Sequence, residues 1–217
     1  RKVWPRPANC DELEYQIRNW GLFPWLSGDH IVEQHVQSLD IGNWLAGCCP
    51  VNAVGQGGRL PSGEGQAGQT LDFHFVEFTY GNEFRVFSQS RRAADCWNAA
   101  GEFVHGTKGS ANLTNGRIYN RAGNVVWQRN GRHDGWQREQ SDLFHALRAG
   151  QRPSEAAVGA ASTMTAIMGR IASYSHQRVT WDDALFESLP LASADCLQSL
   201  RDIAPVQPDR QGHYPRP

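Results

Sequence analysis

Hydrophobic and polar positions repeat with a helical period over residues 28–47. The polar and aromatic side chains that recur there at spacings of three or four share one face of a helix; they are His30, Glu33, Gln37, Asp40 and Trp44. Asp29 is expected to cap this helix and Gly47 to end it, and Pro50 prevents its continuation. The pattern therefore predicts a single helix with a polar stripe.

Such a stripe has two interpretations. Ionisable groups in register along a buried helix are typical of side chains that face a ligand. The same spacing also fits a polar first turn followed by a core histidine whose hydrogen bonds are satisfied internally. Spacing alone does not separate the two.

Strand-like alternation follows the helix, and the helical period then returns. Strands are predicted at 50–58, 72–80, 83–91, 99–106, 111–113, 117–120 and 125–128, with a hairpin turn at Gly81-Asn82. Helices are predicted at 137–149, with Leu143, Ala146 and Leu147 inward, and at 156–174, with Ala157, Ala160, Ala161, Met164, Ile167, Met168 and Ile171 inward. A short helix begins at Trp181, capped by Thr180. This order predicts an α+β fold whose sheet has one face covered by helices.

The chain is divided here into three parts. Residues 1–27 are rich in Trp, Pro and Arg and are expected to be irregular. Residues 28–190 are expected to form the α+β domain, and residues 191–217, with no apolar period, a C-terminal tail.

Charge and cysteine content exclude several classes of protein. The 217 residues carry 21 basic and 22 acidic side chains, a net charge of −1, which gives no electrostatic case for nucleic acid or an anionic membrane. No apolar run is long enough to span a bilayer. Five cysteines, two of them adjacent, do not suggest a disulfide framework, and no Cys/His spacing suggests zinc. We therefore expect reduced thiols, no metal and a cytoplasmic location, unless an export signal lies upstream.

Separated motifs at 28–47, 55–59, 105–109, 162–170 and 179–181 resemble the Gfo/Idh/MocA oxidoreductases, the family of glucose–fructose oxidoreductase and inositol dehydrogenase. The resemblance covers residues 12–190 and concerns the C-terminal domain of that family. It implies an open-faced, largely antiparallel sheet with helices on one face. It also implies NAD or NADP bound by a nucleotide-binding domain that is missing from this chain.

Two departures from the family pattern bear on activity. Gln37 occupies the position of the histidine that serves as general acid or base in the family, and the nucleotide-binding half is missing. Glu33 stands where the family usually has Asp, and Asp40 matches. Residues 55–58 do not form the GxGxxG loop that binds dinucleotides, so no cofactor-binding residue is expected here.

Candidate site residues follow from the helix and the resemblance. His30, Glu33 and Gln37 are the catalytic candidates: Gln37 cannot take a proton near neutral pH, so base duty falls to His30 or to a lysine upstream. Asp40, Arg91, Trp25 and Trp97 are candidates for substrate binding; a solvated arginine and ordinary aromatic packing are the alternatives. His35, His74 and His105 are interpreted as structural.

The sequence thus predicts the substrate-binding domain of an NAD(P)-dependent oxidoreductase. Its substrate would be a sugar, polyol or inositol-like hydroxyl compound, with redox chemistry as one possible step in glycoside cleavage. The alternative is a non-catalytic sugar-binding or assembly module of the same fold. Self-association is expected through the open sheet face, with Phe73, Phe75, Phe84 and Val86 as the candidate residues.

Overall fold

The computed structural model describes residues 3–60, 68–93, 95–131 and 134–186, which belong to two compact units. The first unit contains residues 1–96 and 161–217, and the second contains residues 97–160. Both antiparallel sheets and the helices between them agree with the predicted α+β class. Within the described ranges, none of the helices has the length and apolar character needed to cross a membrane.

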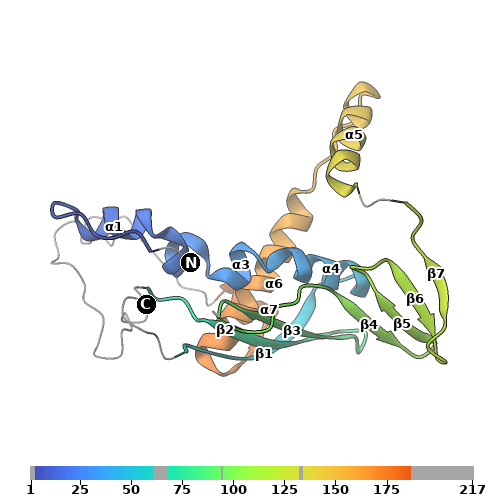
Figure 1. Ribbon diagram of the computed structural model, residues 1–217, viewed down its shortest axis with the longest axis horizontal. Helices are drawn as coiled ribbons and strands as arrows, with labels where there is room; N and C mark the ends of the chain where they lie inside the picture. Colours follow the sequence, from blue (N-terminus) through green and yellow to red (C-terminus); the bar gives the residue numbers. More distant parts are fainter. Residues whose placement is uncertain (1–2, 61–67, 94, 132–133, 187–217) are drawn as a thin grey trace. The chain divides into compact units, whose positions relative to one another are not determined.

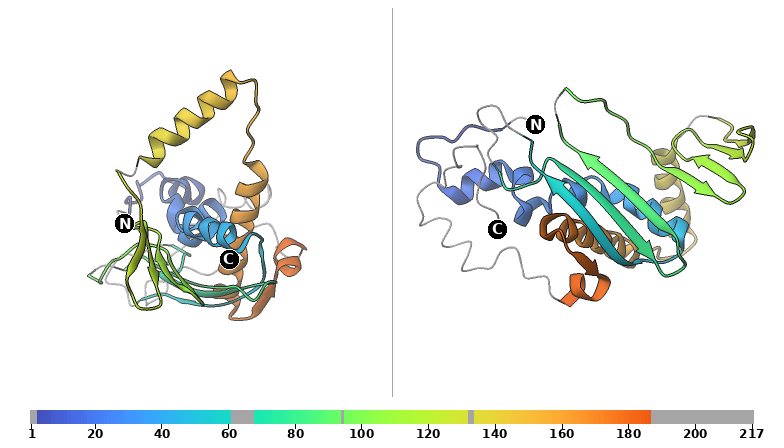
Figure 2. Two further views of the ribbon diagram at one scale, coloured as in Figure 1. Left: turned by 90° about the vertical axis from the view of Figure 1, so that its right-hand side faces the viewer. Right: turned by 90° about the horizontal axis from the view of Figure 1, so that it is seen from below.

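The first unit is built on an antiparallel sheet with the strand order β3-β2-β1-β8. Its strands are β1 (Pro50–Gly58), β2 (Phe73–Tyr80), β3 (Arg85–Arg91) and β8 (Arg178–Thr180). Side chains of β2 alternate: His74, Val76, Phe78 and Tyr80 are buried, whereas Phe73 and Phe75 are exposed. Helices lie over the buried face (Figure 1), and the other face is seen from below in Figure 2. The open-faced sheet inferred from the sequence is therefore confirmed.

The N-terminal part of the first unit is helical. It contains α1 (Glu12–Arg18), the 3₁₀ turn η1 (Trp20–Leu22) and α2 (Pro24–Ser27). Asp11 caps α1 by accepting a hydrogen bond from the Glu14 N–H at 2.7 Å. The expectation of an irregular opening through Pro24 is therefore wrong, because helices this short leave little apolar period to detect.

The predicted helix over residues 28–47 is divided in two. Helix α3 (His30–Glu33) ends at Gln34, and α4 (Val36–Ala46) starts after His35. Gly47 ends α4 in the left-handed conformation, as expected. Because of the break, the polar stripe does not face one surface: His30 is buried, whereas Gln37 and Trp44 are exposed.

Helix α6 (Ala156–Ser175) packs on the sheet with a face of small residues. Its buried positions are Ser162, Thr165, Ala166, Met168, Gly169, Ala172 and Ser173, so only Met168 of the predicted inner face is fully buried. The close approach follows from two glycines. A Cβ atom added to Gly55 of β1 would lie 2.9 Å from the Ser173 nitrogen, and one added to Gly169 would lie 2.7 Å from Phe78. The helix α7 (Trp181–Phe186) follows β8.

The second unit is a meander of four short strands and one helix. The strands β4 (Phe103–Gly106), β5 (Gly109–Asn112), β6 (Arg117–Asn120) and β7 (Val125–Gln128) pair in sequence order. Helix α5 (Gly135–Arg148) has no buried residue, and Leu143 and Leu147, predicted to point inward, are exposed. The predicted tail, residues 191–217, lies outside the described residues.

Candidate functional site

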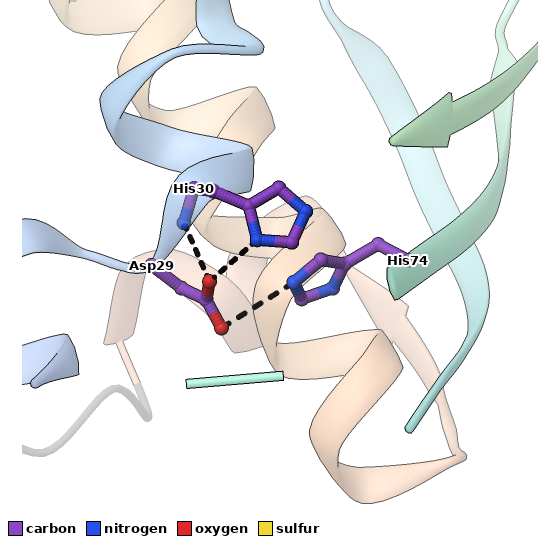
Figure 3. A group of neighbouring side chains, drawn as sticks. All are labelled: Asp29, His30 and His74. Carbon is purple, nitrogen blue, oxygen red and sulfur yellow. Dashed lines mark hydrogen bonds and ion pairs between the residues drawn. The ribbon is translucent and has the colours of Figure 1, made fainter. Parts of the chain in front are cut away.

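A buried carboxylate at the start of α3 collects polar groups from three distant segments. Asp29 Oδ1 accepts from the backbone N–H of His30 at 2.5 Å and lies 2.9 Å from His30 Nδ1. Its Oδ2 accepts from the Leu71 N–H at 3.0 Å and the Tyr174 hydroxyl at 2.7 Å. His74 Nε2 of β2 lies 3.3 Å from the same oxygen, as Figure 3 shows. We call Asp29, His30 and His74 the Asp–His–His cluster.

The backbone at Asp29 is strained. Its φ of 70° and ψ of 164° fall in a region that is essentially reserved for glycine. The Ser27 hydroxyl oxygen holds this turn by accepting from the Asp29 N–H at 3.0 Å. Non-glycine residues keep such a conformation only where their surroundings impose it, and here the five polar groups around the carboxylate do so.

The ionisation states of the cluster are set by burial and by these contacts. Burial disfavours the charged carboxylate, but its contacts with His30 and His74 prevail and hold the pKa of Asp29 well below its usual range. Burial lowers the pKa of His74 in spite of Asp29. Burial and the Asp29 charge raise the pKa of the Tyr174 hydroxyl. At neutral pH the carboxylate is therefore ionised, the His74 ring neutral and the Tyr174 hydroxyl protonated.

Two further polar contacts lie near the cluster, one made by His30 and one made by Glu33. His30 Nε2 lies 3.2 Å from the Ser90 hydroxyl on β3, so both ring nitrogens of His30 have partners. Beyond Ser90, Arg92 donates to Glu33 Oε2 at 2.8 Å, and both side chains are half-buried. Glu33 and Arg92 are thus the charged groups of this region that can meet a solute.

The structure brings together only some of the predicted site residues. His30 is 3% exposed, and Glu33 follows it in α3. Gln37 is exposed on α4, and Asp40 accepts a hydrogen bond from the Ser162 hydroxyl at 2.5 Å, which joins α4 to α6.

The other predicted residues lie elsewhere. Because side chains alternate along a strand, Arg91 points to the open face, opposite to Ser90. The Trp25 indole donates to Gln16 Oε1 at 2.6 Å in a separate small core, and Trp97 belongs to the second unit. The assignment of these three residues to substrate binding stays a prediction.

Four residues around the cluster were not assigned to a site from the sequence: His74, Tyr174, Ser90 and Arg92. Alternation along β2 could have placed His74 on the buried face, but its partner Asp29 comes from a different segment. His35, interpreted as structural, does bond internally, because its Nε2 lies 2.7 Å from the Ser88 hydroxyl.

Comparison with known proteins gives a result at the level of structure. No family model matches the sequence, and no curated protein is significantly similar to it. Aldose–aldose oxidoreductase from Caulobacter crescentus, solved with glycerol, superposes with a TM-score of 0.60 at 15% identity over 74% of this chain and 50% of its own. Myo-inositol 2-dehydrogenase from Lactobacillus plantarum gives a TM-score of 0.55 at 17% identity over 71% of this chain and 49% of its own. The fold is that of the C-terminal domain of Gfo/Idh/MocA-type oxidoreductases.

A further structure that shares this fold is an oxidoreductase from Agrobacterium radiobacter in complex with NAD⁺, L-tartaric acid and magnesium. It gives a TM-score of 0.55 at 11% identity over 79% of this chain and 54% of its own. The chain thus spans about half the length of these proteins.

Proposed function

We propose that this chain is the substrate-binding domain of a nicotinamide-dependent oxidoreductase that acts on a hydroxyl group of a sugar, polyol or inositol-like compound. The observation that carries the proposal is the shared fold over 71% to 79% of the chain. Those structures are an inositol dehydrogenase, an aldose–aldose oxidoreductase with glycerol, and an oxidoreductase with NAD⁺, L-tartaric acid and magnesium. NAD or NADP would be bound by a domain outside these residues.

Glu33 and Gln37 are the residues that we assign to the substrate. Hydride transfer requires a group that positions the reacting hydroxyl and a group that removes its proton. Glu33 is fixed by Arg92 and offers a carboxylate oxygen to a hydroxyl; Gln37 is exposed and can both donate and accept. His30 is buried behind Ser90, so we do not assign it to direct proton transfer from substrate.

Binding by this chain can be tested without the cofactor. In ¹H–¹⁵N NMR titrations with glucose, myo-inositol and glycerol, we expect shift changes centred on Glu33, Gln37 and Arg92. Glu33→Gln and Gln37→Ala should each weaken binding by about 2- to 10-fold, the effect of one hydrogen bond of roughly 0.5–1.5 kcal/mol. Glu139→Gln, on the exposed face of α5, is the control and should leave binding unchanged. Shift changes confined to other residues would contradict the assignment.

The second candidate function is a non-catalytic sugar-binding or assembly module. It is favoured by Gln37, which cannot exchange a proton near neutral pH and stands where the resembling family has its acid–base histidine. The two functions differ in a protein that joins this domain to a nucleotide-binding domain. If the chain is non-catalytic through loss of that histidine, Gln37→His should raise turnover from background by about 10²–10⁴-fold, the usual contribution of acid–base catalysis. Measurable turnover by the unmodified protein would instead support the enzyme.

A further inference from the structure

We propose that the Asp–His–His cluster binds one divalent cation, zinc by the type of its ligands, and that this ion fastens the start of α3 to strand β2. Asp29, His30 and His74 each offer one ligand atom, and these atoms all lie within 4.8 Å of one another. All three residues are buried. One carboxylate and two imidazoles are ligands that suit zinc. The spacing of Cys and His along the chain does not indicate a metal site, because Asp29 and His30 lie far from His74 in the sequence.

Two distances within the cluster are close to those expected between ligand atoms of one shared ion. Two ligand atoms bound to one tetrahedral zinc at about 2.0–2.2 Å are separated by roughly 3.3 Å. Asp29 Oδ1 lies 2.9 Å from His30 Nδ1, and Asp29 Oδ2 lies 3.3 Å from His74 Nε2. In Figure 3 both rings approach the carboxylate between them. The ligand atoms lie within 4.8 Å of one another, so the ion would be admitted by side-chain shifts that bring all three atoms to about 2.0–2.2 Å from one point.

His74 supplies an independent observation. Its side chain is 1% exposed, yet neither of its ring nitrogens has a well-directed hydrogen bond to any residue that the structure describes. Its Nε2 faces Asp29 only at ion-pair distance. Buried polar atoms without a partner are rare in folded proteins, and an unseen ion is one of the usual reasons for them. Coordination of Nε2 would satisfy this atom.

The surroundings orient the ligands in the way that metal sites require. The Leu71 N–H and the Tyr174 hydroxyl hold Asp29 Oδ2. When His30 binds the ion through Nδ1, its proton resides on Nε2, and the Ser90 hydroxyl at 3.2 Å turns to accept it.

One neighbour opposes the ion. Arg170 donates to the Gly28 carbonyl at 3.4 Å, next to the cluster, and its positive charge repels a cation. We therefore expect weaker affinity than three such ligands would give alone. A zinc ion held by three protein residues completes its tetrahedron with a water molecule, and all three residues are buried here.

The test is direct metal binding to the 217-residue chain after treatment with a chelator. Because thiols also bind these metals, the experiment uses a Cys48→Ser/Cys49→Ser background, which removes the adjacent pair. Titration with CoCl₂ should give one equivalent per chain with the visible absorption of tetrahedral cobalt, and ZnCl₂ should displace it. Absence of stoichiometric binding would overturn the proposal.

Matched variants assign the site. His74→Gln should weaken binding by at least about tenfold, whereas His105→Gln, which replaces an exposed histidine of β4, should leave it unchanged. Tyr174→Phe keeps all three ligands but removes a donor that orients Asp29, so we expect binding weakened by about 10- to 100-fold. Should His74→Gln fail to fold, as judged by circular dichroism, Tyr174→Phe decides. Unchanged affinity in either folded variant would refute the site. These readouts involve no turnover, so their failure would not bear on the proposed function.

Discussion

Gly169 lies where helix α6 comes closest to the sheet. A Cβ atom at this position would be 2.7 Å from Phe78 and 3.1 Å from Ile31, both fully buried. Rigid core aromatics cannot withdraw as a surface side chain can. The small residue is thus a packing requirement, although alanine is the better helix former.

We expect Gly169→Ala to lower the free energy of unfolding by about 1–2 kcal/mol, because overpacking exceeds the gain in helix propensity. Gly159→Ala in the same helix is the control, since no atom lies within 4 Å of the added methyl group. It should stabilise by about 0.5–1 kcal/mol. Urea denaturation of both variants measures the difference. Equal effects in the two variants would show that α6 does not approach the sheet this closely.

Two cysteines of the first unit should differ in reactivity. Burial raises the pKa of the Cys10 thiol, whereas Cys48 is exposed. Only the thiolate reacts with alkylating reagents, so Cys48 should be modified well before Cys10 at pH 8. Peptide mass mapping during iodoacetamide treatment follows both sites. Faster labelling of Cys10 would mean that the N-terminal core around Tyr15 and Phe23 opens readily.

At the scale of residues, the sequence predicted the local features of the site and missed the distant ones. Spacing singled out His30 and Glu33, and alternation could place His74 on the inner face of β2. No local pattern, however, connects Asp29 to His74 or Tyr174, because these contacts form only when separate segments fold together. Neither could helical spacing foresee that Arg92, rather than Arg91, would reach Glu33.

At the scale of elements, the inner face of α6 shows why periodicity was misleading. Apolarity ranks Ala and Ile as inward and Ser and Thr as outward. Here Thr165 and Ser173 are buried because their hydroxyls donate to the carbonyls of Ala161 and Gly169 at 3.1 Å and 2.8 Å. A hydroxyl that donates its hydrogen bond within its own helix can be buried like a small apolar group, and the pattern of apolar residues does not reveal this.

The break between α3 and α4 also involves a polar side chain that the apolar pattern does not take into account. His35 stands at the junction and reaches the Ser88 hydroxyl on β3. The backbone N–H groups of Gln34 and His35 both donate to the His30 carbonyl, at 3.1 Å and 3.0 Å, and the second of these bonds spans five residues, so that the helix widens there. The side-chain contact with the sheet thus accompanies a local departure from the helical path, although the residues themselves have ordinary helix propensities.

A reciprocal cap starts α7 and makes it sensitive to acid. The Asp183 N–H donates to the Thr180 hydroxyl oxygen at 3.1 Å, and the Thr180 N–H donates to Asp183 Oδ2 at 2.8 Å. Hydrogen bonds from Thr180 lower the pKa of the Asp183 carboxyl. A carboxyl with a lowered folded-state pKa contributes stability above its unfolded pKa of about 3.9, and this contribution is lost as the pH falls through the folded value.

We therefore expect NMR titration to find the pKa of Asp183 below the usual value for an aspartate. Thr180→Ala removes the hydroxyl and should move the pKa of Asp183 upward. Hydrogen exchange in α7 should accelerate in acid in the unmodified protein. A titration of Asp183 that Thr180→Ala leaves unchanged would exclude this cap.

At the scale of the whole molecule, the α+β class could be predicted because strand alternation and helical periods occupy separate stretches of the sequence. The pairing of β1 with both β2 and β8 could not be predicted from the sequence, since β8 lies more than a hundred residues further along the chain. The candidate residues of the open face were half correct. Phe73 and Phe75 lie on it, whereas Phe84 and Val86 pack against the core.

The open sheet face of the first unit should mediate self-association. It exposes Phe73, Phe75, Phe87, Val51 and Val54, an apolar surface of the kind that proteins usually cover. We expect analytical sedimentation at protein concentrations of about tens of micromolar to show oligomers, because interfaces of this kind usually associate in that range. Phe87→Glu, at a side chain that is 61% exposed, should shift the protein to monomer without loss of fold. Glu77→Gln is a mild control on the same face. A monomeric unmodified chain would contradict this expectation.

The contacts of Asp29 also affect when the first unit can fold during synthesis. Its carboxylate receives donors from Leu71, 42 positions later in the chain, and from Tyr174, 145 positions later. During synthesis on the ribosome, the aspartate therefore emerges long before the groups that neutralise its burial. The helical layer over β2 cannot close around an uncompensated charge, so the first unit should remain loosely packed until α6 has been made. Translation of the last helices, rather than collapse of the first strands, would then set the moment at which this unit becomes native.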